Sequence, residues 1–201
     1  ADQPPLLYDY YGFPQESYEL EYPAPGDQRL SDAVRAALGE HGFSCGEEAE
    51  RGFDHGLFVP LTIMYPEADV PLFQVSLQKR YDPAAHFALG RALAPLRDEG
   101  VLIIGSGLSY HNLRAFGPGA KTPSEAFDTW LTDTLALPPA ERTAALVNWE
   151  TAPYARDCHA QEDHFAPIFA ALGAAEEESA TRIYHQKNIY GGVTASGYRF
   201  G

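Results

Sequence analysis

Four of the seven histidines in the chain lie in settings where an imidazole could do chemistry. His55 lies between glycines in GFDHGLF, His111 follows the glycine-interrupted run IIGSG, and His159 and His164 share the segment DCHAQEDHF. Neutral imidazole is the commonest metal ligand in proteins, and it is also the acid or base best suited to neutral pH. These four residues are therefore candidates for metal binding or proton transfer.

Asn112 directly follows His111 and adds an amide that can both donate and accept hydrogen bonds. Loops at the ends of sheet strands are where α/β proteins build sites, so the four dispersed histidines could converge there. The alternative is that each of them caps a helix or bonds a backbone carbonyl, and the spacing leaves both interpretations open. For His41, His86 and His185 we expect structural roles, because histidine is often partly buried without any function.

Other catalytic patterns are weak or absent in the sequence. The run GSGLS does not match G-x-S-x-G and lacks the lysine of a phosphate-binding loop, and neither H-E-x-x-H nor C-x-x-C occurs. Cys158 precedes His159, but adjacent side chains usually point apart, so we do not expect a thiolate nucleophile. The two distant cysteines, Cys45 and Cys158, form no disulfide framework, which favours a reducing, cytoplasmic compartment.

The overall composition excludes two classes of partner. The 201 residues include 28 acidic and 14 basic side chains, which gives a formal net charge of −14. Such a charge repels nucleic acid backbones and anionic membrane surfaces. No apolar run approaches the ~20 residues that a membrane-spanning helix needs. We therefore expect neither nucleic acid nor a membrane as a partner.

The elements that must position the histidines alternate between helical and extended patterns. Amphipathic or capped segments predict helices at 29–42, 81–100, 122–137, 138–149 and 161–173. Branched and aromatic runs predict strands at 57–66, 70–77 and 101–107, and in the C-terminal runs ATRIYHQ and GGVTASGYRF. The alternation predicts an α/β fold, a single domain with a central mixed sheet flanked by helices.

Local signals refine two of the predicted helices. Asp82 as N-cap and Pro83 at the first helical position predict the start of the helix at 81–100, and Pro95 should kink or shorten it. Thr122 and Glu125 have the spacing of a capping box at the start of the helix at 122–137.

Six blocks in order along the chain carry a family resemblance. They are YDYYGFP, YPAPG, GFDHG, PLTIMYPEADVPLFQVSL, LRDEGVLIIGSGLSYHNLR and EDHFAPIFAALGAA. As a set they resemble the class III extradiol ring-cleavage dioxygenases, in the branch typified by the 4,5-DOPA dioxygenases. The resemblance implies an α/β fold, one non-haem Fe(II) or Zn(II) per site, and cleavage of a catechol ring by O₂ beside its two hydroxyls.

The resemblance also implies roles for individual residues. His111 in SYHNLR would act as acid and base close to the metal, and in some relatives it would count as a ligand. His164 in EDHF would be a metal ligand. His55 would be a second catalytic histidine that faces substrate or O₂, and His159 and Asn112 would bind substrate. Glycines before His111 would let the backbone and the substrate approach closely at the end of a strand.

One part of the family pattern has no counterpart in these residues. The family places two further histidine ligands upstream of the YDYYGFP block. We therefore expect residues 1–201 to be an extradiol dioxygenase-like catalytic domain without the N-terminal part of the family domain. That part would be a separate chain or a piece removed by cleavage; otherwise the chain is a metal-free descendant, or its own histidines regroup around a metal.

The leading functional prediction is a metal-dependent dioxygenase that cleaves a catechol-type ring. One alternative is a non-catalytic protein on the same fold, which binds a small aromatic molecule or serves as a partner subunit. Another is a hydrolase that uses a zinc-bound water.

Overall fold

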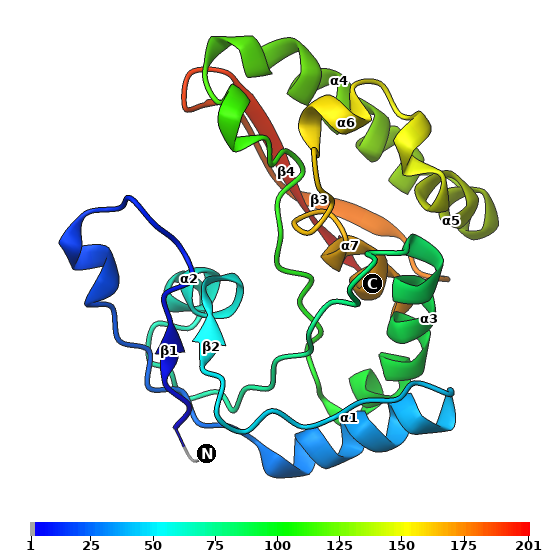
Figure 1. Cartoon of the computed structure of the whole chain (residues 1–201). Helices are drawn as coiled ribbons and strands as arrows, with labels where there is room; N and C mark the ends of the chain where they lie inside the picture. Colours follow the sequence, from blue (N-terminus) through cyan, green and yellow to red (C-terminus); the bar gives the residue numbers. More distant parts are fainter. Residues whose placement is uncertain (1–2) are drawn as a thin grey trace. The chain divides into compact units, whose positions relative to one another are not determined.

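The computed structural model describes residues 3–201, which form two compact units, up to Ser76 and from Leu77 onward (Figure 1). Each unit has its own set of buried apolar residues. The two units are described separately below.

The N-terminal unit holds a short parallel sheet and two helices. Strand β1 (Leu6–Leu7) pairs with β2 (Phe53–Asp54). A 3₁₀ turn at Gln15–Tyr18 and helix α1 (Gln28–Glu40) lie between the two strands in sequence, and α2 (His55–Met64) directly follows β2. Helix α1 matches the predicted helix at 29–42; it buries Val34 and Leu38. The core of this unit consists of Tyr22, Ala24, Phe58, Leu61 and Ala68.

Two strand predictions in this unit are wrong. The run at 57–66 is the helix α2, in which Phe58 and Leu61, one turn apart, point into the core. A short apolar run has the same composition in a buried helix and in a buried strand, so its pattern could not decide between them. The segment at 70–77 forms no ladder; Leu72 makes one isolated bridge with Gly26.

The C-terminal unit is mainly helical and carries one β-hairpin (Figure 1). Strands β3 (Ala180–Ile189) and β4 (Val193–Phe200) pair antiparallel, which confirms both C-terminal strand predictions. The helices are α3 (Pro83–Leu93), α4 (Lys121–Leu135), α5 (Pro139–Val147), α6 (Ala155–Cys158) and α7 (Pro167–Gly173). Short 3₁₀ turns lie at Ala94–Glu99, Leu113–Ala115, Pro118–Ala120 and Trp149–Thr151.

Aromatic residues form the centre of this unit. Phe127 on α4, Trp149, Phe165 and Phe169 on α7 are all at most 2% exposed. Successive rings pack edge to face or tilted, with centroids 5.1 to 6.4 Å apart. Such contacts add to the burial of apolar area, so they hold α4 and α7 in fixed positions around the segment between α6 and α7.

The local helix signals had mixed outcomes. The Asp82 side chain accepts a hydrogen bond from Ala85 N at 2.7 Å, and α3 gives way to a 3₁₀ turn just before Pro95, both as predicted. The predicted capping box is wrong, because α4 begins at Lys121 and no side chain caps it.

Another predicted helix is shorter than expected. Of 161–173, only the part from Pro167 onward is α-helix, preceded by tight turns. Pro167 has no N–H to continue a helix from the residues before it, so it suits a helix start.

The segment at 101–107 is extended but irregular, and no described residue pairs with it as a strand. Its side chains Leu102 and Ile104 are 64% and 43% exposed. The prediction of a buried strand here is therefore wrong for the described residues.

The α/β class is confirmed by these elements. The described strands form two separate two-stranded sheets, one parallel and one antiparallel, where we expected one mixed sheet. None of the described helices combines the length and the apolar character needed to span a membrane.

Candidate functional site

Two of the predicted histidines, His111 and His164, lie face to face in the C-terminal unit. Their ring centroids are 3.4 Å apart, and the ring planes differ by 17°. Asp163 lies beside them: one ligand atom from each of the three side chains lies within 4.8 Å of the other two. All three residues are partly buried. Two imidazoles and a carboxylate are the donor combination of many non-haem Fe(II) sites, and zinc also accepts these ligands.

Hydrogen bonds between two distant segments bring the rings together. Residues 108–112 run alongside residues 157–164, and each segment supplies one of the stacked histidines. These hydrogen bonds run from Leu108 N to His164 O at 2.8 Å, from His111 N to Cys158 O at 2.9 Å and from Asn112 Nδ2 to Asp157 O at 2.8 Å. Because two of these bonds use backbone N–H groups, the position of His111 is fixed by the main chain.

Two glycines make this close contact feasible. A Cβ on Gly107 would lie 2.2 Å from His164 O, and one on Gly105 would lie 2.5 Å from Pro167 O. Any side chain at these positions would push the two segments apart. The glycines thus let backbone approach backbone, as predicted, although His111 does not follow a strand.

The turn that carries Asp163 and His164 is held at its start by Glu162. Arg156 NH1 lies 2.7 Å from Glu162 Oε2, and the Arg156 guanidinium lies 4.7 Å from the centroid of the Trp149 ring. The backbone carbonyl of Glu162 accepts hydrogen bonds from the next residues of the turn, at positions 165 and 166. The two site residues therefore sit in a turn that is anchored on both sides.

His159 lies in the core next to this site. Its side chain is fully buried, its Nε2 lies 3.1 Å from Ser109 O, and its ring packs on Phe165 with centroids 4.9 Å apart. Burial lowers the pKa of His159 to about 4, and the hydrogen bond to Ser109 opposes that shift only in part. The ring is therefore neutral at pH 7. Its predicted role in binding substrate stays a prediction.

His55 lies in the N-terminal unit, at the start of α2. Its Nδ1 lies 2.7 Å from Asp9 Oδ1, and its backbone N–H donates to the same oxygen. Burial raises the pKa of Asp9, but the hydrogen bonds from His55 outweigh that effect, and the net shift is downward. His55 and His111 belong to different compact units, and the predicted catalytic role of His55 stays a prediction.

The three remaining histidines have the structural settings that we expected. His86 is fully buried, with Nδ1 2.7 Å from Asp82 O, and its Nε2 accepts a hydrogen bond from Gln78 N. His41 and His185 each hydrogen-bond a nearby protein oxygen through Nδ1.

Cys158 is not a nucleophile in this setting. Its side chain is fully buried, and burial raises the pKa of the thiol to about 12. The thiol is therefore protonated at neutral pH, which confirms that the adjacent Cys158 and His159 do not form a thiolate pair.

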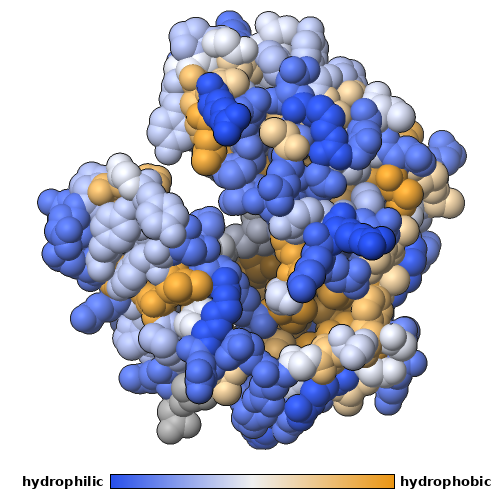
Figure 2. Space-filling model, in the orientation of Figure 1, coloured by the Kyte–Doolittle hydropathy of each residue, from blue (hydrophilic) through white to orange (hydrophobic). Residues whose placement is uncertain are grey.

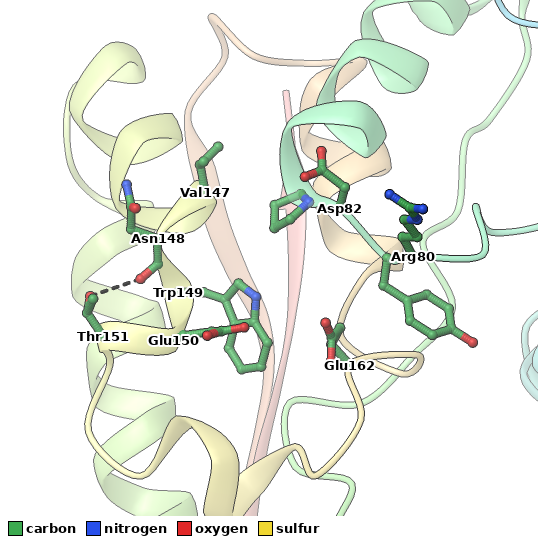
Figure 3. A pocket seen from close by; sticks show the side chains of 10 residues that line it. Arg80, Asp82, Val147, Asn148, Trp149, Glu150, Thr151 and Glu162 are labelled. Carbon is green, nitrogen blue, oxygen red and sulfur yellow. Dashed lines mark hydrogen bonds between the residues drawn. The ribbon is translucent and has the colours of Figure 1, made fainter.

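A separate pocket of about 500 Å³ lies between the start of α3 and the end of α5. Figure 3 shows Asp82 on one side of it and Trp149 and Glu150 on the other, with Glu162 below. Two of its carboxylates, Glu150 and Glu162, are ion-paired with Arg156, and Asp82 caps α3. Its acidic groups already have protein partners, so we do not place the reaction here.

Sequence analysis missed Asp163. The block EDHF was interpreted through His164 alone, although an acidic residue directly beside a predicted ligand is a signal in itself. The proximity of Asp163 to His111 depends on the folded contact between the two segments, which no spacing in the sequence could predict.

Comparisons with known proteins show the family of the chain. A protein-family model described as the catalytic LigB subunit of aromatic ring-opening dioxygenase matches residues 1–201. The 4,5-DOPA dioxygenase extradiol of Beta vulgaris is 40% identical over 199 residues, which cover 96% of this chain and 73% of the relative. The protein of the same name from Portulaca grandiflora is 36% identical, over 98% of this chain and 74% of the relative.

A solved structure agrees as well. The crystal structure of an uncharacterized protein from Escherichia coli K12 superposes with a TM-score of 0.79 at 30% identity, covering 92% of this chain and 77% of that one. The sequence match over all 201 residues and the structural match together assign the fold. The chain belongs to the LigB family of aromatic ring-opening dioxygenases.

Proposed function

We propose that this protein is a non-haem, metal-dependent extradiol dioxygenase that cleaves a catechol-type ring with O₂. The observation that supports the proposal most is that His111 stacks on His164 beside Asp163 in a chain of this family. Imidazole and carboxylate donors of this kind fit Fe(II), and we propose Fe(II) rather than Zn(II) because reaction with O₂ calls for a redox-active metal. When bound, the metal would supply Lewis-acid and redox chemistry for catechol and O₂.

His164 is the proposed metal ligand, and Asp163 supports it. Asp163 Oδ2 lies 3.2 Å from His164 Nδ1, close enough to orient the imidazole. A carboxylate next to a ligand ring also adds negative charge, which favours a cation at the site.

His111 is the proposed acid and base. Its ring stacks on that of His164, so a hydroxyl of a substrate held at His164 would be close to the imidazole. A general base must be within hydrogen-bond reach of the proton that it takes. The hydrogen bond from His111 N to Cys158 O fixes the backbone from which the imidazole extends. His111 would take a proton from the catechol and return it to the product.

Asn112 and His55 are the proposed substrate contacts. Asn112 is partly buried beside His111, and its Nδ2 donates to Asp157 O, which fixes the amide at the edge of the site. His55 is proposed on the family resemblance alone; its Nδ1 lies 2.7 Å from Asp9 Oδ1, which orients the imidazole.

The function is tested with protein that has been loaded with Fe(II) without oxygen and then given a series of catechols. We expect O₂ uptake together with the visible absorbance of a ring-opened product. His164→Ala should bind Fe(II) at least ~10-fold more weakly and lose turnover. His41→Ala, which changes an exposed histidine of the N-terminal unit, is the matched control and should behave like the wild type. No O₂ uptake with any catechol by the iron-loaded protein would contradict the proposal.

A further inference from the structure

His159 is an unusual residue for its position in the core. Its side chain is fully buried among Phe127, Trp149 and Phe165, with ring centroids 4.9 to 5.8 Å away. Its Nδ1 is buried without a hydrogen-bond partner. An unpartnered buried polar atom costs free energy, and a phenylalanine would fill the same space without that cost. Packing therefore does not explain why this residue is a histidine.

The other ring nitrogen has a specific partner. Nε2 lies 3.1 Å from Ser109 O, and because a carbonyl only accepts hydrogen bonds, Nε2 carries the proton and donates. Ser109 lies two residues before His111. Its Oγ also accepts a hydrogen bond from Ser196 N on β4 at 3.4 Å, so Ser109 is held from two sides.

The ring of His159 also packs against the segment that carries His164. It packs nearly parallel to Phe165, with an interplanar angle of 29°, and Phe165 directly follows His164. One rigid side chain thus contacts the backbone that carries His111 and the residue next to His164. Aromatic neighbours on the remaining sides leave the imidazole little freedom to move.

We propose that His159 is a positioning residue that sets the spacing of His111 and His164 through its hydrogen bond to Ser109. The proposal rests on the function proposed above for its effect on turnover, but the ring spacing itself is independent of that function. A shift of about 1 Å in a catalytic group can cost on the order of 100-fold in rate, so this bond would act through the position of His111 and needs no contact between His159 and substrate.

The test uses two variants and a matched control. His159→Phe keeps an aromatic ring and removes the donor. His159→Gln removes the ring but keeps an N–H donor at a similar distance from the backbone. His86→Phe is the control, because His86 is equally buried and its hydrogen bonds serve α3 and the segment before it.

The first readout needs no turnover. Stacked rings shift each other's proton resonances, so NMR of the histidine side chains reports the contact between His111 and His164 in metal-free protein. We expect His159→Phe to lose these ring-current shifts, and His159→Gln and His86→Phe to retain them. Unchanged shifts in His159→Phe, or an equal loss in His86→Phe, would overturn the proposal.

The second readout is kinetic. In iron-loaded protein we expect His159→Phe to lower kcat by ~10- to 100-fold with KM and iron affinity within about threefold of wild type. His159→Gln should recover part of the loss. If kcat is unchanged in His159→Phe, the proposal is wrong. If the wild type turns over no catechol, the proposed function fails, and the NMR readout alone decides the role of His159.

Discussion

At the scale of single residues, the account depends on what stands next to each histidine. His111 and His164 are stacked and lie near the carboxylate of Asp163. His86 is as deeply buried as His159, but it has protein partners at both ring nitrogens. Residue type alone does not separate these cases. The contact partners and the burial of each ring do separate these cases, and they lead to two predictions for single side chains.

The role of His111 can be separated from that of a metal ligand. We predict that His111→Gln lowers kcat by ~100- to 10,000-fold, because it removes the proton-transfer group, while Fe(II) affinity stays within about threefold of wild type. The measurement is turnover alongside competition with a chromophoric chelator, with His41→Gln as the control. A large loss of iron affinity would instead make His111 a ligand.

The buried, neutral His159 predicts a pH dependence of stability. Its pKa in the folded protein is about 4, below the ordinary 6.5, so between these values the unfolded chain binds a proton that the native protein does not. The neutral ring therefore makes its full contribution to the free energy of unfolding above about pH 6.5. Roughly 3 kcal/mol of that free energy is lost as the pH falls toward 4.

Urea denaturation at a series of pH values measures this loss. The wild type should lose more stability than His159→Phe between pH 6.5 and 4, because phenylalanine has no proton to bind. The same pH dependence in both proteins would show that His159 is not the group responsible.

At the scale of elements, the site is a contact between two loops rather than the end of a sheet. Residues 108–112 and 157–164 are bonded to each other, and Gly107 allows the contact. We predict that Gly107→Ala destabilises the protein by about 1–3 kcal/mol and lowers turnover, because its Cβ would meet His164 O.

The control for this substitution is Gly119→Ala. A Cβ at Gly119 would have no atom within 4 Å, so this variant should stay close to wild-type stability in urea denaturation. Equal effects of the two substitutions would contradict the close contact at Gly107.

How much the sequence could predict also differs at this scale. Signals that act within a few residues were reliable in part: Asp82 caps α3 and the two C-terminal strands form, whereas the capping box expected at Thr122 does not. The run at 101–107 has the composition of a buried strand, but a strand also needs a partner, and pairing is a long-range property. The run at 57–66, most of which lies in α2, was predicted to be a strand. It was too short to show whether its apolar residues recur with a helical or a strand period.

The site itself was predicted in part. The family resemblance singled out His111 and His164, and the structure brings these two together. Asp163 was missed because its proximity to His111 arises only in the folded protein. The roles of His55, Asn112 and His159 at a substrate stay predictions.

At the scale of the whole molecule, the net charge and the family membership limit which classes of molecule we expect as partners. The net charge of −14 argues against nucleic acid, and Figure 2 shows a face on which hydrophilic residues are widespread around apolar areas. The LigB family match spans both compact units, so the proposed activity belongs to the chain as a whole and not to the turn of Asp163 and His164 alone.

The most direct test of the central claim follows the oxygen atoms. Iron-loaded protein is given its best catechol under ¹⁸O₂, and the product is analysed by mass spectrometry. A ring-opening dioxygenase places both atoms of one O₂ molecule in the product, so we predict that both appear there, before any exchange with water. A product whose added oxygen comes only from water would contradict the account and favour hydrolysis.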